Sequence, residues 1–290
     1  MPDILYAPNQ EHIVTTNVWA FLHWLRVTHG IDMAGWAALQ RWSVDDRAAF
    51  AQSIGAFARL PDGPLLLARH QGEREALVLR RAEGQRIALS WDDLLDPLPN
   101  TPLRGGAELP LPRSGGGSGR GTIPAAITIP LTRLWSPAEL ARPLVDTLLH
   151  ADLRPDDRVV IANSSAWPWL AALLEGTTVI LAAATPATLL ATAAEEHASV
   201  LVAPAQALAE AAFHRARHRP HLAALRTIIA TGGPLSPEGR TRIYTWIKSD
   251  LMLLARTGDT MWGNPLEPVC ARPAASPGFV TPPTAIPVPR

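Results

Sequence analysis

The sequence predicts an α/β fold with a mostly parallel sheet, a helical N-terminal cap and a disordered C-terminal tail. From residue 123 onward, short apolar runs alternate with helical segments of about 10 to 15 residues, which is typical of βαβ units. Residues 17–60 instead carry apolar side chains at helical spacing. After residue 263 the chain is rich in proline and has no apolar period, which indicates a disordered tail.

The N-terminal segment predicts two helices. In "NVWAFLHWLRVTHG", Trp19, Leu22 and their neighbours lie near one face, and Gly30 stands where a C-terminal cap is expected. In the second helix, Ser43 and Asp46 have the spacing of a capping box. The apolar stripe that follows from Phe50 is expected to pack into the core.

The middle of the chain predicts a hairpin followed by a linker. The runs "EALVLRR" and "QRIALSW" are joined by "AEGQ", and residues 96–121 are then dominated by proline and glycine. The expected organisation is a helical cap, a hairpin with a Pro/Gly-rich linker, an α/β domain and a Pro-rich tail. These four parts span residues 1–60, 61–121, 122–263 and 264–290.

Strands of the α/β section are predicted at "IPAAITIP", "RVVIAN", "TTVILAAA", "SVLVAP" and "RTIIAT". Helices are predicted between them, and two begin with the sequence Ser-Pro, at Ser136 and at Ser236. A serine cap followed by proline at the first helical position is a strong signal of a helix start. Proline has no backbone N–H, and at that position an N–H would have no partner within the helix.

Composition excludes several classes of protein. The 26 basic and 26 acidic residues balance to zero net charge, so neither a nucleic acid nor an anionic membrane is an expected partner. Cys270 is the only cysteine, which excludes an intramolecular disulfide and a cysteine-based zinc site. The N-terminus has no signal-peptide pattern and no run of 18 apolar residues occurs, so we expect a cytoplasmic protein.

Two histidines stand at helical i, i+4 spacing, His214 and His218, which is a spacing that can hold a metal. The alternative, which we favour, is a basic, solvated helix end that Pro220 terminates. No metal site is therefore expected.

Three collinear pieces of the chain resemble the acetoacetyl-CoA synthetases, a family of adenylate-forming acyl-CoA synthetases. They are "HGIDMAGWAALQRWSVDD", "LLHADLRPDDRVVIANSSAWPWLAALLEGTTVIL" and "LRTIIATGGPLSPEGRTRIYTWIKSDLMLLARTGDTMWGNPLEPV". The resemblance implies a trimmed N-terminal domain of the adenylate-forming (AMP-binding) fold. The implied activity is that of an ATP-dependent acid-thiol (acyl-CoA) ligase.

The resemblance also implies a phosphate-binding loop at "GSGRGTIPAAIT", with Ser118, Gly119 and Arg120 as its residues. Backbone amides of such a loop can converge on phosphate oxygens. The family's loop ends in Pro-Lys, whereas Ala125 stands in the place of the lysine, and Arg120 is the neighbouring cation that could replace it. The alternative is a flexible linker, since a Gly-rich run followed by alanine is common in such segments.

An adenine loop is implied at Gly232, Gly233 and Pro234, although the same residues also suit a turn before a Ser-capped helix. Thr260 matches a family threonine near the phosphates. The family's next residue is an acid that holds magnesium, and Met261 replaces it.

These departures predict a catalytically impaired pseudoenzyme. The family's ribose-binding aspartate, hinge and C-terminal domain are also not found after "GNPLEPV". We therefore expect no catalytic residues, weak binding of ATP or AMP or of an acyl ligand, and no magnesium. Two alternatives remain open: a noncatalytic subunit or decayed fragment that self-associates or binds a protein partner, and an active acid-activating ligase with a rebuilt site.

Overall fold

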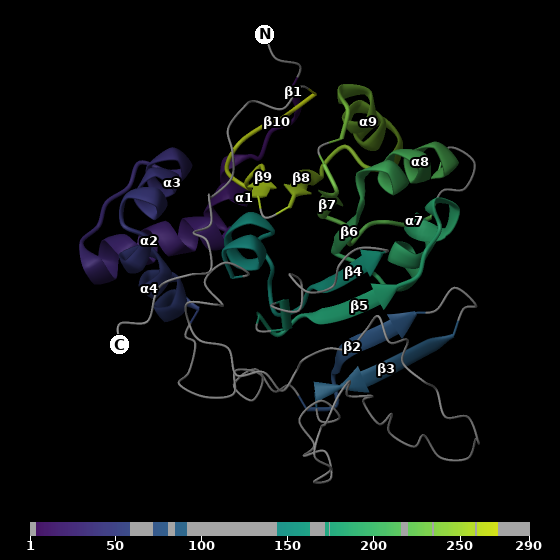
Figure 1. The fold of residues 1–290 in the computed structure, drawn as a ribbon, viewed down its shortest axis with the longest axis horizontal. Coiled ribbons are helices and arrows are strands. Elements are labelled where there is room, and N and C mark those ends of the chain that lie inside the picture. The colour runs from purple at the N-terminus through teal and green to yellow at the C-terminus, as the bar shows by residue number, and fades with distance from the viewer. Residues whose placement is uncertain are drawn as a thin grey trace.

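The computed structural model describes residues 4–58, 72–80, 85–91, 144–162, 172–173, 175–215, 220–233, 235–258 and 260–271. An eight-stranded sheet forms its centre, in the order β3-β2-β5-β4-β6-β7-β8-β9 (Figure 1). Adjacent strands from β2 to β8 are parallel, and the edge strands β3 and β9 are antiparallel to their neighbours. The predicted α/β fold with a mostly parallel sheet is confirmed. The strands are β2 (Glu75–Arg80), β3 (Arg86–Ser90), β4 (Arg158–Ala162), β5 (Thr178–Ala182), β6 (Val200–Pro204), β7 (Thr227–Thr231), β8 (Met252–Thr257) and β9 (Thr260–Trp262).

The predicted hairpin is present, and it belongs to the large sheet. Its strands pair from Glu75↔Ser90 to Arg80↔Arg86, and β2 lies parallel to β5 on its other side. The four central residues of β2, from Ala76 to Leu79, are buried. A strand that is apolar on both faces is typical of the interior of a parallel sheet, which explains why the hairpin joins the α/β section.

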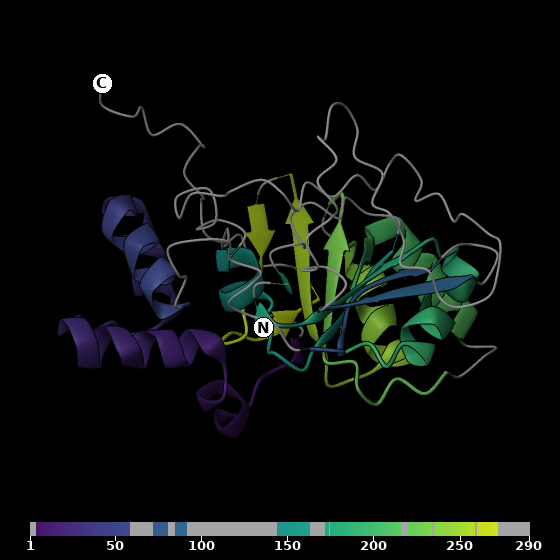
Figure 2. The ribbon, with the colours of Figure 1, turned by 90° about the horizontal axis from the view of Figure 1, so that it is seen from below.

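Three helices cover one face of the sheet, α7 (Pro186–Glu195), α8 (Ala205–Arg215) and α9 (Pro237–Arg242), which continues as η5 (Ile243–Ile247) (Figures 1 and 2). The predicted start of α9 is confirmed, because the Ser236 hydroxyl accepts a hydrogen bond from the Gly239 amide at 3.1 Å. The opposite face of the sheet buries a second apolar cluster that includes Trp91.

The N-terminal helices form a layer beside the sheet (Figures 1 and 2). They are α1 (Gln10–Val14), α2 (Asn17–His29), α3 (Trp36–Asp45) and α4 (Arg47–Phe57). The apolar faces of α2, α3 and α4 share one core with Leu144 and with the short helix η3 (Val145–His150). Gly30 adopts the left-handed conformation at φ 66° and ends α2, which confirms the predicted cap.

The predicted capping box at Ser43 is wrong. Ser43 lies inside α3, where its hydroxyl donates to the Gln40 carbonyl at 2.6 Å. The chain turns three residues later, and the Asp46 carboxylate accepts from the Ala49 amide at 3.1 Å. Aspartate and serine are both good N-cap residues. Because Ser43 is buried within α3, Asp46 is the residue that caps α4.

Asp152 ties the helical layer to the sheet. Its carboxylate is buried and accepts from the Asn17 amide at 2.7 Å, at the first residue of α2. The Asn17 side chain donates in turn to the Leu153 carbonyl at 2.7 Å. Arg154 and Arg226 supply the positive charges that this buried carboxylate requires, at 3.0 and 3.6 Å.

A second, two-stranded sheet pairs β1 (Ile4–Tyr6) with β10 (Val269–Cys270). Residues 264–271, at the start of the segment expected to be a tail, therefore contain a short strand, whereas residues 272–290 lie outside the described residues. Among the helices that the structure describes, none combines the length and apolarity needed to cross a lipid bilayer.

Candidate functional site

The carboxyl ends of β7 and β8 bring two predicted site segments together. The strands are parallel, and Thr231 lies opposite Arg256. Gly232 and Gly233 follow the end of β7 directly, beside the turn that leads from β8 to Thr260. The carboxyl ends of parallel strands are where α/β sheets usually bind ligands. We take this edge as the candidate site.

Both glycines of the β7 turn require their residue type for conformational reasons. Gly232 has φ 81° and Gly233 has φ 145°, which side chains with a Cβ rarely adopt. A Cβ built on either residue meets no atom of the described residues within 4 Å, its chain neighbours aside, so the described part of the chain leaves space beside this backbone. A planar ring can approach such a backbone closely. Pro234 lies outside the described residues.

Thr260 and Met261 face opposite sides of the sheet. Thr260 is half-buried, while Met261 is 1% exposed and packs into the apolar cluster of the second face. Mg²⁺ binds oxygen ligands, and a buried thioether supplies none. The position at which the resemblance implies a metal-binding acid therefore does not fit a metal. Asp259 lies outside the described residues.

Sequence reasoning missed a buried ion pair at this edge. Arg256 stands near the end of β8 with a side chain 10% exposed, and its Nη2 lies 3.4 Å from Oδ2 of Asp146, whose side chain is 5% exposed. The Arg256 Nε also donates to the Gly258 carbonyl at 3.1 Å. The available signal was an arginine that ends the apolar run "LMLLAR", because a charge on a buried strand requires a partner.

His150 joins η3 to the segment after β9. Its ring is fully buried, lies edge-on to Trp36 with centroids 4.9 Å apart, and contacts the Gly263 carbonyl through Nδ1 at 2.8 Å. Burial lowers the pKa of His150 to about 4, and the hydrogen bond to Gly263 opposes the shift only in part. The ring is therefore neutral at pH 7, with Nδ1 donating to the carbonyl.

The other predicted positions are not brought to this edge by any described contact. The proposed phosphate loop, with Ser118, Gly119, Arg120 and Ala125, lies outside the described residues and stays a prediction. His214 and His221 are exposed, and His218 is not described. Within the described ranges, no three His, Cys, Asp or Glu residues gather as a metal site would require.

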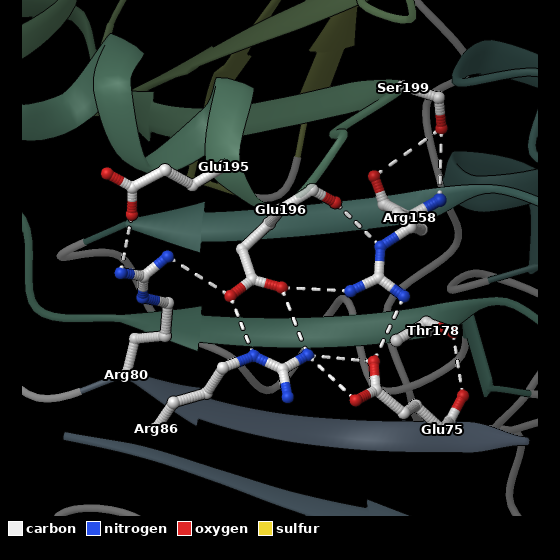
Figure 3. Close-up of polar contacts among 8 residues, drawn as sticks. All are labelled: Glu75, Arg80, Arg86, Arg158, Thr178, Glu195, Glu196 and Ser199. Atoms are coloured by element: carbon white, nitrogen blue, oxygen red, sulfur yellow. Dashed lines mark hydrogen bonds and ion pairs between the residues drawn. The ribbon is translucent and has the colours of Figure 1, made fainter. Parts of the chain in front are cut away.

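A second cluster of charges surrounds Glu196, at the end of α7 (Figure 3). The Glu196 side chain is 3% exposed and pairs with Arg80 at 3.1 Å, with Arg86 at 3.0 Å and with Arg158 at 2.9 Å. Burial by itself raises the pKa of Glu196, but the hydrogen bonds and charges of Arg86 and Arg158 outweigh it and hold that pKa below its ordinary value. Glu196 therefore remains ionised at neutral pH.

The pairing of the charges within this cluster indicates a structural role. Glu75 bridges Arg86 and Arg158 at 2.8 and 3.1 Å, and Glu75, Arg158 and Thr178 are each the first residue of a strand. They lie at the amino ends of β2, β4 and β5, whereas Arg80 is the last residue of β2 and pairs with Arg86, so the cluster extends along β2 from one end to the other. Figure 3 shows the carboxylates and guanidiniums directed at one another. The network clamps the end of α7 onto β2, β3 and β4.

No protein-family model matches the chain. Over 158 residues it is 32% identical to the acetoacetyl-coenzyme A synthetase of Rhizobium meliloti (strain 1021), a match that covers 48% of this chain and 24% of that protein. The solved structure of the acetoacetyl-CoA synthetase from Streptomyces lividans is similar with a TM-score of 0.72. That likeness covers 96% of this chain and 69% of the solved chain, at 16% sequence identity.

The fold is thus part of the adenylate-forming fold, with the N-terminal helices included. The sequence match adds a similarity at the level of residues. Over 158 residues the chain is similar to an acetoacetyl-coenzyme A synthetase, and its fold is similar to that of another. The sequence match spans about a quarter of the curated relative, so the activity of the whole synthetase is a matter for proposal.

Proposed function

We propose that this synthetase-like protein binds an adenine nucleotide at the carboxyl edge of β7 and β8, weakly and without magnesium, and does not form acyl-adenylate. The observation that carries the proposal is the contrast between the two turns at this edge. Among the described residues, none fills the space beside the backbone of the Gly232–Gly233 turn, whereas Met261 is turned into the core.

The β7 turn supports binding of the base. Its two glycines lie in the conformational region that favours glycine, and within the described part of the chain no atom beyond their chain neighbours lies within 4 Å of the position of a Cβ. Backbone groups at the carboxyl end of a parallel sheet can contact a ring without side-chain help. Thr260, half-buried at the start of β9, is the hydroxyl proposed to lie near the phosphate.

The β9 turn supports the loss of metal-dependent chemistry. Adenylate formation develops negative charge that metal ions and fixed cations stabilise, and enzymes of this kind need on the order of 8 to 23 kcal/mol of barrier lowering. Met261 provides no oxygen ligand, and Ala125 stands where the resemblance implies a lysine. Two of the groups that hold the β- and γ-phosphates are therefore replaced by apolar side chains.

Calorimetric titration tests the binding half of the proposal. We expect AMP and ATP to bind with similar affinity, with no effect of magnesium, and Gly232→Val to abolish both because it forces a branched Cβ into the left-handed region. Gly72→Val is the matched control, since Gly72 also has a positive φ and lies far from the site in sequence. A strong magnesium-dependent preference for ATP contradicts the proposal and favours a rebuilt, active site.

Pyrophosphate release tests the catalytic half. With acetoacetate, ATP and magnesium, the protein is expected to release no more pyrophosphate than a control without enzyme. Release above that control, abolished by Gly232→Val, overturns the proposed impairment.

A second candidate function is self-association as a noncatalytic subunit, favoured by an aromatic pair on the surface. Phe213 of α8 and Trp246 of η5 are 54% and 36% exposed, with ring centroids 6.3 Å apart. Contiguous exposed aromatic surface often marks an interface. Light scattering at micromolar concentration should show association that Phe213→Ser with Trp246→Ser removes; a monodisperse monomer excludes this function.

A further inference from the structure

We infer that Arg240 is the charged centre of an anion-binding site between α9 and the ribbon of β1 and β10, and that this site takes a carboxylate or phosphate group of a small molecule. The inference goes beyond the proposed nucleotide function, because it uses none of the residues at the carboxyl edge of β7 and β8. Neither the resemblance nor the comparisons give this arginine a role.

The burial of an arginine without an acid is the first argument. Among the residues that the structure describes, two arginines are buried, Arg240 at 7% exposure and Arg256 at 8%. Arg256 pairs with the Asp146 carboxylate at 3.4 Å, whereas Arg240 forms no ion pair with any described residue. Because arginine does not lose its proton in proteins, Arg240 is a buried cation without a carboxylate. A buried charge requires a partner.

The contacts of Arg240 provide hydrogen bonding but no permanent negative charge. Its Nε donates to the Cys270 carbonyl at 2.9 Å, and this acceptor is neutral. Tyr244 follows one turn later; burial raises the pKa of its phenol, which therefore stays neutral and donates to the Leu251 carbonyl at 2.8 Å. Burial also lowers the pKa of Arg240, as expected for a cation with no acid beside it.

The free end of the guanidinium is the second argument. The contact with Cys270 occupies Nε, and within the described part of the chain Nη1 and Nη2 make no hydrogen bond. Neither of them is among the fully buried side-chain atoms that lack a partner, so both retain contact with solvent. Two N–H groups on one planar guanidinium match two oxygens of a carboxylate or phosphate. The bond from Nε fixes that plane in advance, so less freedom is lost on binding.

A purely structural role does not explain the charge. The bond to Cys270 fastens β10 to α9, and a neutral donor such as glutamine could make it. Burying a cation for that purpose alone carries a desolvation penalty that no carboxylate offsets. An anion from outside the chain accounts for both the burial and the charge.

Thermal unfolding followed by circular dichroism tests the inference on the whole chain. Sodium phosphate or sodium acetate replaces sodium chloride at constant ionic strength, so general screening does not change. We expect at least one of the two oxoanions to raise the melting temperature saturably, by roughly 2 to 4 °C at about ten times its Kd. The more effective of the two identifies the group that is recognised. No saturable rise with either anion overturns the inference.

Substitutions at two arginines of the same helix locate the effect. Arg240→Gln keeps a donor for Cys270 but lacks the charge, and it should lose the rise. Arg242→Gln, which changes an exposed arginine of α9, is the matched control and should keep it. Equal losses in both variants indicate a general charge effect and overturn the inference. If Arg240→Gln fails to fold, Arg240→Lys decides: the rise should be reduced, because lysine has no planar fork, and an unchanged rise overturns the inference.

Gly232→Val separates this site from the proposed nucleotide site. The variant is expected to bind no nucleotide, yet it should keep the full rise in melting temperature with the oxoanion. Loss of the rise in Gly232→Val would place the anion at the edge of β7 and β8 and overturn the role of Arg240. Failure of the unmodified protein to bind AMP or ATP overturns only the nucleotide function, because the oxoanion titration measures the Arg240 site directly.

Discussion

His150 should make the free energy of unfolding depend on pH between about 6.5 and 4. Most of this range lies above the pH at which carboxylates become protonated. The ring is fully buried between Trp36 and Gly263, and burial lowers its pKa to about 4. In the unfolded chain a histidine has its ordinary pKa of about 6.5. Between these values the unfolded state binds one proton more than the native state, so stability falls as the pH falls.

The magnitude follows from linkage. The stabilising contribution of neutral His150 is fully present above pH 6.5, is lost progressively as the pH falls towards the native pKa of about 4, and is constant below it. Between pH 7 and pH 5 this one group should remove about 2 kcal/mol from the free energy of unfolding, at up to about 1.4 kcal/mol per pH unit.

Urea unfolding followed by circular dichroism at a series of pH values measures this loss. His150→Gln should lack the part of the pH dependence that is due to this residue. The difference in free energy of unfolding between the unmodified protein and His150→Gln should therefore change by about 2 kcal/mol between pH 7 and pH 5. His221→Gln, which changes an exposed histidine, is the matched control and should retain the wild-type slope. Parallel curves for the protein and His150→Gln refute the reasoning.

Two further substitutions test the packing. Glu196→Gln should reduce the free energy of unfolding by roughly 3 kcal/mol, because three arginines lose a carboxylate that is 3% exposed, while the 60%-exposed Glu195→Gln should cost under about 1 kcal/mol in the same urea titration. Equal effects of the two contradict the clamp. Gly263→Ala should lower the melting temperature more than Gly72→Ala, because both residues have a positive φ but only Gly263 places a Cβ 2.9 Å from Leu254 Cδ2. Equal shifts would show that this contact relaxes at no cost.

Much of the architecture could be predicted from local pattern. The hairpin strands, the parallel strands β4 to β7 and the caps at Gly30 and Ser236 follow from apolar periodicity and from residues whose backbone chemistry favours one conformation. The cap at Asp46 shows the limit of that reasoning. Ser43 and Asp46 are both good N-cap residues. Which of them caps the helix depends on tertiary packing, which buries Ser43 within α3.

The candidate site was only partly predictable. Gly232 and Gly233 are recognisable because few other residues tolerate positive φ, and their place after an apolar strand predicts a carboxyl edge. The partners of Arg256 and His150 could not be predicted. Asp146 is 110 residues from Arg256 in the sequence. The sequence around an aspartate in a helical segment is equally compatible with a solvent-exposed side chain and with a buried one.

By itself, the sequence determined the class of fold, the similarity to acetoacetyl-CoA synthetase and the presence of Met261 where that similarity implies an acid. Only the tertiary structure decided that the hairpin extends the large sheet, that Met261 is turned into the core, and that Arg256 is buried beside Asp146. The physical reason is the range of the interactions. Apolar periodicity and backbone preference act over a few residues, whereas burial and charge pairing depend on which distant segments pack together.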